Sequence, residues 1–208
     1  MPIPALLRQF LVVLTMLSAL GSSPLSGQWR LGIEVGAARF WGGSEEIGGT
    51  HTSFRPYRPT TFGIGLERQG PRYGFGLQVH YFQAGLALVG PDVVVSAEGA
   101  FEAVSISPEA MLHLATIGAG NRLRVHAGPV FEVWDIIDSG TRTRVGARGA
   151  VSFDVPLGER FAGMVLAGAA ITPSPYEDGE LDLGEGAPAY ERRALWRRSF
   201  GVGLNYRL

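Results

Sequence analysis

The sequence contains no cysteine and no lysine. Without cysteine, the chain has no disulfide framework, no thiolate metal site, no cysteine nucleophile and no lipid attachment point of the bacterial lipoprotein type. Its 18 basic residues, all arginine, are balanced by 19 acidic residues. This balance excludes the broad basic surface by which many proteins bind nucleic acid, so no nucleic-acid partner is expected.

Charged residues and helical patterns are also scarce. Charged residues make up 18% of the chain, below the usual quarter, whereas its 30 glycines are about twice the average share. Beyond residue 28, no long stretch keeps an apolar period of 3.6, and none is long enough for a membrane helix. The composition therefore indicates a non-helical protein whose surface is not mainly in contact with water.

Residues 1–28 have the pattern of a secretory signal peptide. Arg8 precedes the apolar run FLVVLTMLSAL, which is followed by small and turn-forming residues. The run is shorter than the roughly 20 residues of a membrane-spanning helix, and Gly21 and Pro24 follow it. An uncleaved helical anchor is the alternative. We expect export of the chain, with residues 29–208 as one mature domain.

The remaining chain alternates apolar residues with small or polar ones. In the final segment SFGVGLNYRL, the residues Phe200, Val202, Leu204, Tyr206 and Leu208 share one face of an extended strand. Seven other segments alternate in the same way or are apolar on both faces: 29–41, 62–67, 73–82, 104–114, 122–133, 144–155 and 161–171. Pro108 predicts a bulge or an unpaired position in its strand.

The connectors alternate in length. Four longer stretches, 42–58, 90–99, 135–141 and 172–195, alternate with three short ones, 70–72, 118–121 and 156–160. Eight strands with long loops at one end and tight turns at the other predict an all-β fold, an antiparallel up-and-down transmembrane barrel.

Aromatic residues on the apolar faces fall near strand ends. Trp29 and Trp41 would lie roughly 28 Å apart along the membrane normal, at ~3.3 Å per residue and ~45° tilt, close to the ~25 Å apolar band. Tyrosine and tryptophan suit this depth because their rings are apolar with one polar end. The predicted membrane-interface aromatics are Trp29, Tyr73, Phe153 and Tyr206 at one end and Trp41, Tyr81, Phe131 and Trp196 at the other.

The opposite faces carry charged residues and histidines, which would point into the lumen. An eight-stranded barrel is just wide enough for side chains to fill it, and buried charges persist when they are paired. We predict a charged plug rather than a wide pore, made of Arg30, Glu34, Glu67, His80, Glu109, His113, Arg124, His126, Glu132, Arg144, Arg148, Asp154, Arg197 and Arg207. A narrow ion path along these groups and a metal site made by the three histidines are the alternatives.

Residues 29–208 resemble the small eight-stranded outer-membrane β-barrel proteins of the OmpA/OmpX type. In that family, an alternating C-terminal strand that ends in an aromatic residue is recognised by the barrel-assembly machinery. Phe200, Val202, Leu204 and Tyr206 match this pattern, and Leu208 departs from it. The resemblance implies residence in the bacterial outer membrane, contact with outer-membrane lipids and lipopolysaccharide, and assembly by that machinery. It also implies a structural or surface-interaction role, with an extracellular partner of unknown identity.

Two other functions are compatible with the pattern. A soluble periplasmic lipocalin-like barrel would turn its apolar faces inward around a ligand. Glycine and alanine on the opposite faces, and aromatics at strand ends, favour the membrane instead. A lipid-modifying enzyme would need a catalytic group, for which His51 with Ser44 or Ser53 is the candidate. No catalytic motif is present, so neither an enzyme nor a cofactor is expected.

The last long connector is acidic. Asp178, Glu180 and Asp182 are alternately spaced oxygen ligands that could bind calcium. A solvated loop is the alternative interpretation of the same residues.

Overall fold

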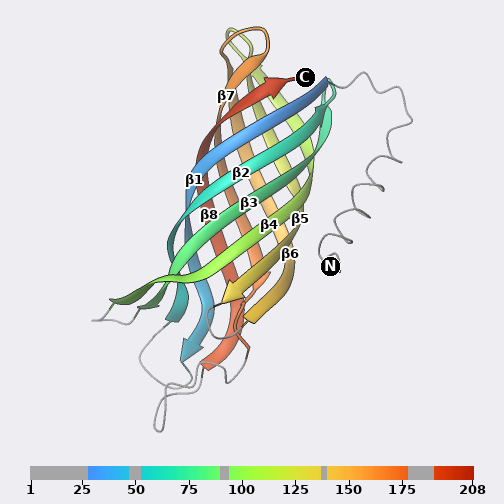
Figure 1. Ribbon diagram of the computed structural model, residues 1–208. Coiled ribbons are helices and arrows are strands. Elements are labelled where there is room, and N and C mark those ends of the chain that lie inside the picture. Colours follow the sequence, from blue (N-terminus) through green and yellow to red (C-terminus); the bar gives the residue numbers. More distant parts are fainter. Residues whose placement is uncertain (1–27, 47–52, 90–93, 137–139, 178–189) are drawn as a thin grey trace, which may run out of the picture.

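The computed structural model describes residues 28–46, 53–89, 94–136, 140–177 and 190–208. They form eight strands: β1 (Gln28–Glu46), β2 (Ser53–Gln69), β3 (Tyr73–Val89), β4 (Val94–Ile117), β5 (Asn121–Ile136), β6 (Gly140–Pro156), β7 (Phe161–Pro173) and β8 (Tyr190–Arg207). Each strand pairs antiparallel with the next, and β1 closes on β8 (Figure 1). The predicted all-β up-and-down barrel is confirmed.

Several sequence predictions fall outside the described residues. They include almost all of the signal peptide at residues 1–28, His51 of the candidate catalytic pair, and the acidic residues Asp178, Glu180 and Asp182. Those predictions remain untested. Within the described part of the chain, we find no helix that is both long and apolar enough to cross a membrane.

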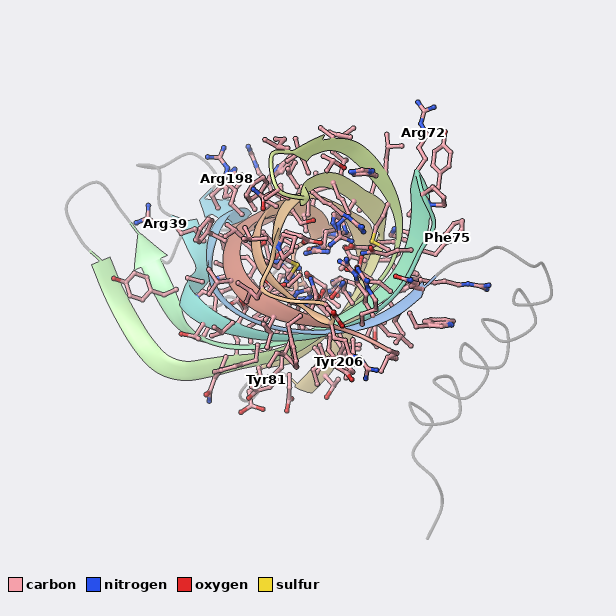
Figure 2. The ribbon with its side chains drawn as sticks, turned by 90° about the horizontal axis from the view of Figure 1, so that it is seen from above. Arg39, Arg72, Phe75, Tyr81, Arg198 and Tyr206 are labelled. Atoms are coloured by element: carbon pink, nitrogen blue, oxygen red, sulfur yellow. The ribbon has the colours of Figure 1, made fainter. Side chains whose placement is uncertain are left out.

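The two ends of the barrel differ. The turn end carries the short connectors 70–72, 118–120 and 157–160 together with the C-terminus, where the Leu208 amide donates to the Trp29 carbonyl at 3.0 Å. The opposite end, here called the loop end, carries the other connectors (Figure 1). At the loop end, the parts of β3 and β4 near their connector bend away from the barrel axis (Figures 1 and 2).

The strands are longer than the sequence pattern predicts. Much of the polar stretch 42–58 belongs to β1 and β2, and β4 already begins at Val94. With 24 residues, β4 would rise roughly 56 Å at ~3.3 Å per residue and ~45° tilt, about twice the ~25 Å apolar band. Apolar alternation cannot reveal these extensions, because a strand beyond the band has no need of an apolar face.

Pro108 marks an unpaired position and not a bulge. The pairing of β4 with β5 runs to Ile106, opposite Phe131, and resumes at Ala110, opposite Ala127, in the same register. Pro108 stays opposite Leu77 of β3, but it has no amide N–H to donate to β5. Ser107 instead donates from its hydroxyl to the Pro129 carbonyl at 2.8 Å.

The apolar strand faces point outward. Ile64 is 60% exposed and Phe200 57% exposed, and similar residues occur on every strand. Figure 2, which views the barrel from the turn end, shows Phe75, Tyr81 and Tyr206 outside the wall. This arrangement contradicts the soluble ligand-binding barrel, in which the same residues would line an interior cavity.

Glycines on the inner faces make room for large polar side chains. A Cβ at Gly201 would collide with the Glu34 carboxylate, and one at Gly65 with the Gln78 amide. Because an eight-stranded barrel leaves little interior width, each long lumen side chain needs a small residue opposite it.

Candidate functional site

The half of the lumen near the turn end holds an ionic cluster, defined here as Arg30, Glu67, Arg124 and Asp154. Arg124 donates to Glu67 from Nη1 at 2.8 Å and to Asp154 from Nη2 at 2.7 Å. Arg30 donates to the same Asp154 at 2.9 Å, and all four side chains are buried. These four residues come from β1, β2, β5 and β6, so the cluster joins strands across the lumen.

The middle of the lumen is organised around His126 and Glu109. His126 Nε2 lies 2.8 Å from the Ser152 hydroxyl, and its Nδ1 lies 3.2 Å from Glu109 Oε2. Glu109 also pairs with Arg148. Beside this group, His80 Nε2 lies 3.4 Å from Glu34 Oε2. Both of these histidines therefore contact a carboxylate, and the contacts link β1 with β3, and β4 with β5 and β6.

Ser152, His126 and Glu109 include the residue types of a hydrolase charge relay. His126 Nδ1 and Glu109 Oε2, however, do not form a hydrogen bond at their 3.2 Å separation, since neither atom has a hydrogen-bond partner. The geometry of a charge relay is therefore not met between them. All three residues are buried, and none lines the cavities found at the two barrel ends. A nucleophile must reach its substrate. These contacts therefore support packing of the lumen.

Glu132 connects the charged part of the lumen to an apolar part. It pairs with Arg197 at 2.9 Å and accepts hydrogen bonds from Trp134 Nε1 at 3.2 Å and Thr172 Oγ1 at 3.1 Å. The Arg197 guanidinium also lies 5.0 Å from the Phe82 ring centroid. Cation–π contact of this kind is stronger in a desolvated interior than at an exposed surface.

Beyond Glu132, towards the loop end, an apolar group fills the lumen. This loop-end cluster consists of Ala38, Phe40, Phe82, Ala84, Phe101, Ala103, Trp134, Ile136, Tyr176 and Leu195, all buried. Trp134 is its centre, with ring centroids 5.3 Å from Phe82, 5.9 Å from Phe40 and 6.3 Å from Phe101 in edge-to-face arrangements. Such edge-to-face contacts are favourable beyond the area that they bury.

The segment that follows β7, residues 174–177, packs against the loop-end cluster. Ser174, Pro175 and Tyr176 are buried, and the Tyr176 ring packs on Phe101 at 5.8 Å. Two arginines of β6 hold its backbone: Arg144 Nε donates to the Ser174 carbonyl at 2.7 Å, and Arg142 Nη1 donates to the Pro175 carbonyl at 2.9 Å.

Eleven of the fourteen predicted lumen residues lie in the buried contacts described above: Arg30, Glu34, Glu67, His80, Glu109, Arg124, His126, Glu132, Arg148, Asp154 and Arg197. Three do not belong to this buried network. His113 bonds the Ala115 carbonyl at 2.9 Å near the turn end, Arg144 holds the segment after β7, and Arg207 lines a cavity of about 50 Å³ at the turn end. Alternation continues past the enclosed part of the lumen, so it does not distinguish rim from interior.

The loop-end cluster was not predicted from the sequence. Nor were four polar partners of the lumen charges: Ser105, which accepts from Arg197, Gln78, which donates to Glu67, and Ser152 and Thr172. A signal was present for the cluster, because Phe82 lies on the same strand face as His80. Inward-facing aromatics two residues from predicted lumen groups could have indicated an apolar layer. Small hydroxyl residues carry no such signal until their partners are known.

The predicted interface aromatics lie on the outer wall, where several contact arginines. Arg68 lies 5.9 Å from the Trp29 ring and Arg72 lies 5.8 Å from the Tyr73 ring, while Arg160 donates to the Tyr206 hydroxyl at 3.0 Å. Towards the loop end, Trp41 and Trp196 stack at 6.0 Å. Tyr81 and Phe131 are exposed, and Phe153 is half-buried. Aromatic rings with cationic neighbours are typical of membrane–water interfaces.

The three histidines do not come together as a metal site. His80 and His126 each contact a carboxylate, whereas His113 lies apart near the turn end. Among the described residues, no group of three or more histidine, aspartate or glutamate side chains is arranged to hold a metal ion.

No family model matches the sequence, and no curated protein matches it. Solved structures do match the fold. The outer membrane protein OprG from Pseudomonas aeruginosa has 11% sequence identity and a TM-score of 0.58, covering 88% of this chain and 96% of its own. Neisserial surface protein A has 10% identity and a TM-score of 0.54, covering 86% of this chain and 97% of its own. The chain therefore has the fold of the small eight-stranded outer-membrane β-barrel proteins.

Proposed function

We propose that the protein resides in the bacterial outer membrane with a closed lumen, and that it acts as a structural or surface-interaction component through its loop end. The observation that carries this proposal is the inverted packing: apolar residues cover the outer wall, while charged and aromatic residues fill the interior. Export by the segment 1–28, handling by the barrel-assembly machinery, contact with lipopolysaccharide, and a non-enzymatic role belong to the same proposal.

The content of the lumen supports closure against solutes. In the turn-end half, Glu67 and Asp154 each accept hydrogen bonds from two or more side chains, so a passing ion would have to displace these partners. In the other half, the loop-end cluster would force an ion to shed its water among aromatic rings. Two barriers of opposite chemistry thus lie in series along the same path.

The length of the strands supports a surface role. Because β4 is about twice as long as an apolar band requires, the barrel wall continues beyond the membrane. Outer-membrane barrels place short turns in the periplasm and long loops outside the cell. By that rule the extended wall of this protein is at the cell surface.

Orientation can be tested by cysteine labelling, because the natural chain has no cysteine to give a background signal. We expect a membrane-impermeant maleimide to label Glu177→Cys on whole cells, since Glu177 is exposed at the loop end. The matched variant Leu157→Cys, in an exposed turn-end connector, should react only after the cells are broken. Labelling of residue 157 on intact cells, with residue 177 protected, would reverse the proposed orientation.

An arginine placed on the outer wall tests whether the protein is a membrane barrel or a soluble barrel. Val35 lies halfway between Trp29 and Trp41 on β1 and is 46% exposed. At a bilayer midplane, Val35→Arg should destabilise the folded protein by ~2–4 kcal/mol. The measurement is urea unfolding in lipid vesicles, with Leu157→Arg in the turn-end connector as the control. Equal stability of the two variants would contradict a lipid-facing wall.

A further inference from the structure

Two arginines oppose each other on the lipid-facing wall. Arg39 of β1 and Arg198 of β8 are direct cross-strand partners, and both are exposed. Figure 2 shows them close together and pointing away from the barrel. Like charges directly opposite each other on neighbouring strands are destabilising. The pair therefore needs a compensating group.

No group in the described part of the chain supplies that compensation. In the described part of the chain, neither Arg39 nor Arg198 forms an ion pair with a carboxylate, in contrast to the lumen arginines Arg30, Arg124, Arg148 and Arg197. On the β7 side, the cross-strand partner of Arg198 is the uncharged Ala169. The positive charge of the arginine pair therefore faces the medium outside the barrel wall.

An aromatic ring holds Arg198, one member of the arginine pair, in place. Trp41 and Trp196 form the next outward-facing cross-strand pair, and their rings stack at 6.0 Å with an interplanar angle of 12°. The Arg198 guanidinium lies 4.5 Å from the Trp41 ring centroid. A guanidinium kept against a ring loses less conformational freedom when it binds an anion.

The depth of the pair matches the polar edge of the membrane. Arg39 is two residues from Trp41 on the turn-end side, which corresponds to roughly 5 Å along the membrane normal. From there the long arginine side chain can extend to the headgroup level. The cost of an arginine on the outer wall is only about 0–1 kcal/mol near the interface.

We propose that Arg39 and Arg198 form a binding site for a phosphate monoester of lipopolysaccharide in the outer leaflet, with Trp41 and Trp196 as its apolar floor. A phosphate monoester carries about −1.5 to −2 charges at pH 7 and three acceptor oxygens, which match two guanidinium groups. A zwitterionic phospholipid carries a single phosphate charge next to its own ammonium group, so it matches the pair less well. This inference rests on the proposed outer-membrane orientation.

The test is titration of the folded full-length protein in detergent micelles with bisphosphorylated lipid A. Binding should raise the temperature at which the folded gel band is lost, because a ligand that binds only the folded state stabilises it. Arg39→Gln combined with Arg198→Gln should weaken the apparent affinity at least tenfold. Arg39→Lys with Arg198→Lys keeps the charge without the bidentate geometry and should give an intermediate affinity.

Arg72→Gln is the matched control, because Arg72 also lies beside an interface aromatic, Tyr73, at 5.8 Å from its ring, but belongs to the turn end. This variant should bind lipid A as the wild type does. The inference is overturned if dephosphorylated lipid A or phosphatidylethanolamine gives the same shift, or if Arg72→Gln weakens binding as much as the double variant. Failure of the wild type to fold in micelles, or reversed cysteine labelling, would instead count against the proposed function and remove the basis of this site.

Discussion

Replacement of Arg124 by methionine is expected to lower the free energy of unfolding by about 3–5 kcal/mol, the usual cost of removing one partner from a buried ion pair. Arg124 contacts both Glu67 and Asp154, and its side chain is only 4% exposed. Methionine fills most of the volume of the arginine side chain. The loss of stability therefore measures the cost of leaving the Glu67 and Asp154 carboxylates without this arginine. Urea unfolding in lipid vesicles, followed by tryptophan fluorescence, measures it.

Two further variants make this result specific. Arg124→Met with Glu67→Gln should recover part of the lost stability, because one of the two stranded charges is then removed, while Asp154 retains Arg30. Arg72→Met removes an exposed arginine from the turn end and should change stability by no more than about 0.5 kcal/mol. If Arg124→Met and Arg72→Met were equally stable, the ionic cluster would contribute little to closure of the barrel.

Replacement of Trp134 by alanine is expected to cost a similar amount, about 3–5 kcal/mol, through loss of buried apolar contacts and formation of a cavity. Trp134 is 0% exposed and contacts the rings of Phe40, Phe82 and Phe101. Its loss also removes a donor to Glu132. Phe131→Ala, on the same strand but facing outward at 40% exposure, is the control. It should cost less in vesicle unfolding, because lipid can fill the space.

The wild type and Trp134→Ala also test whether the lumen is closed. In planar lipid bilayers the wild type should give no stable current steps, because the ionic cluster and the loop-end cluster both obstruct the path. Trp134→Ala should remain closed or give only brief openings, since the ionic cluster is untouched. Long-lived conductance steps in the wild type would show an open pathway and contradict the proposal.

The wall of the barrel was predictable because its rule is local. Alternation in segments such as 199–208 places Phe200, Val202 and Leu204 on one face, and the structure places that face outward. Trp29 and Trp41 lie one apolar thickness apart along β1, and the sequence spacing alone indicates this. The number of strands, their order and the short turns follow from the same reasoning.

The interior was predictable only in composition. Alternation assigns Arg124 and Asp154 to the inner face, but it cannot show that they are partners, because they lie on different strands and meet only after β5 and β6 pair. For the same reason it cannot separate Arg197, which pairs with Glu132, from Arg207, which lines the rim.

By itself, the sequence determined which side chains face outward and which face the lumen, because side-chain direction in a strand depends only on position parity. The tertiary structure decided which side chains contact one another on each of the two faces. Barrel closure brings Arg39 of β1 beside Arg198 of β8, and it gathers Phe40, Phe82 and Trp134 into one apolar layer. These contacts depend on strand register and on the curvature of the closed wall, which no local pattern contains.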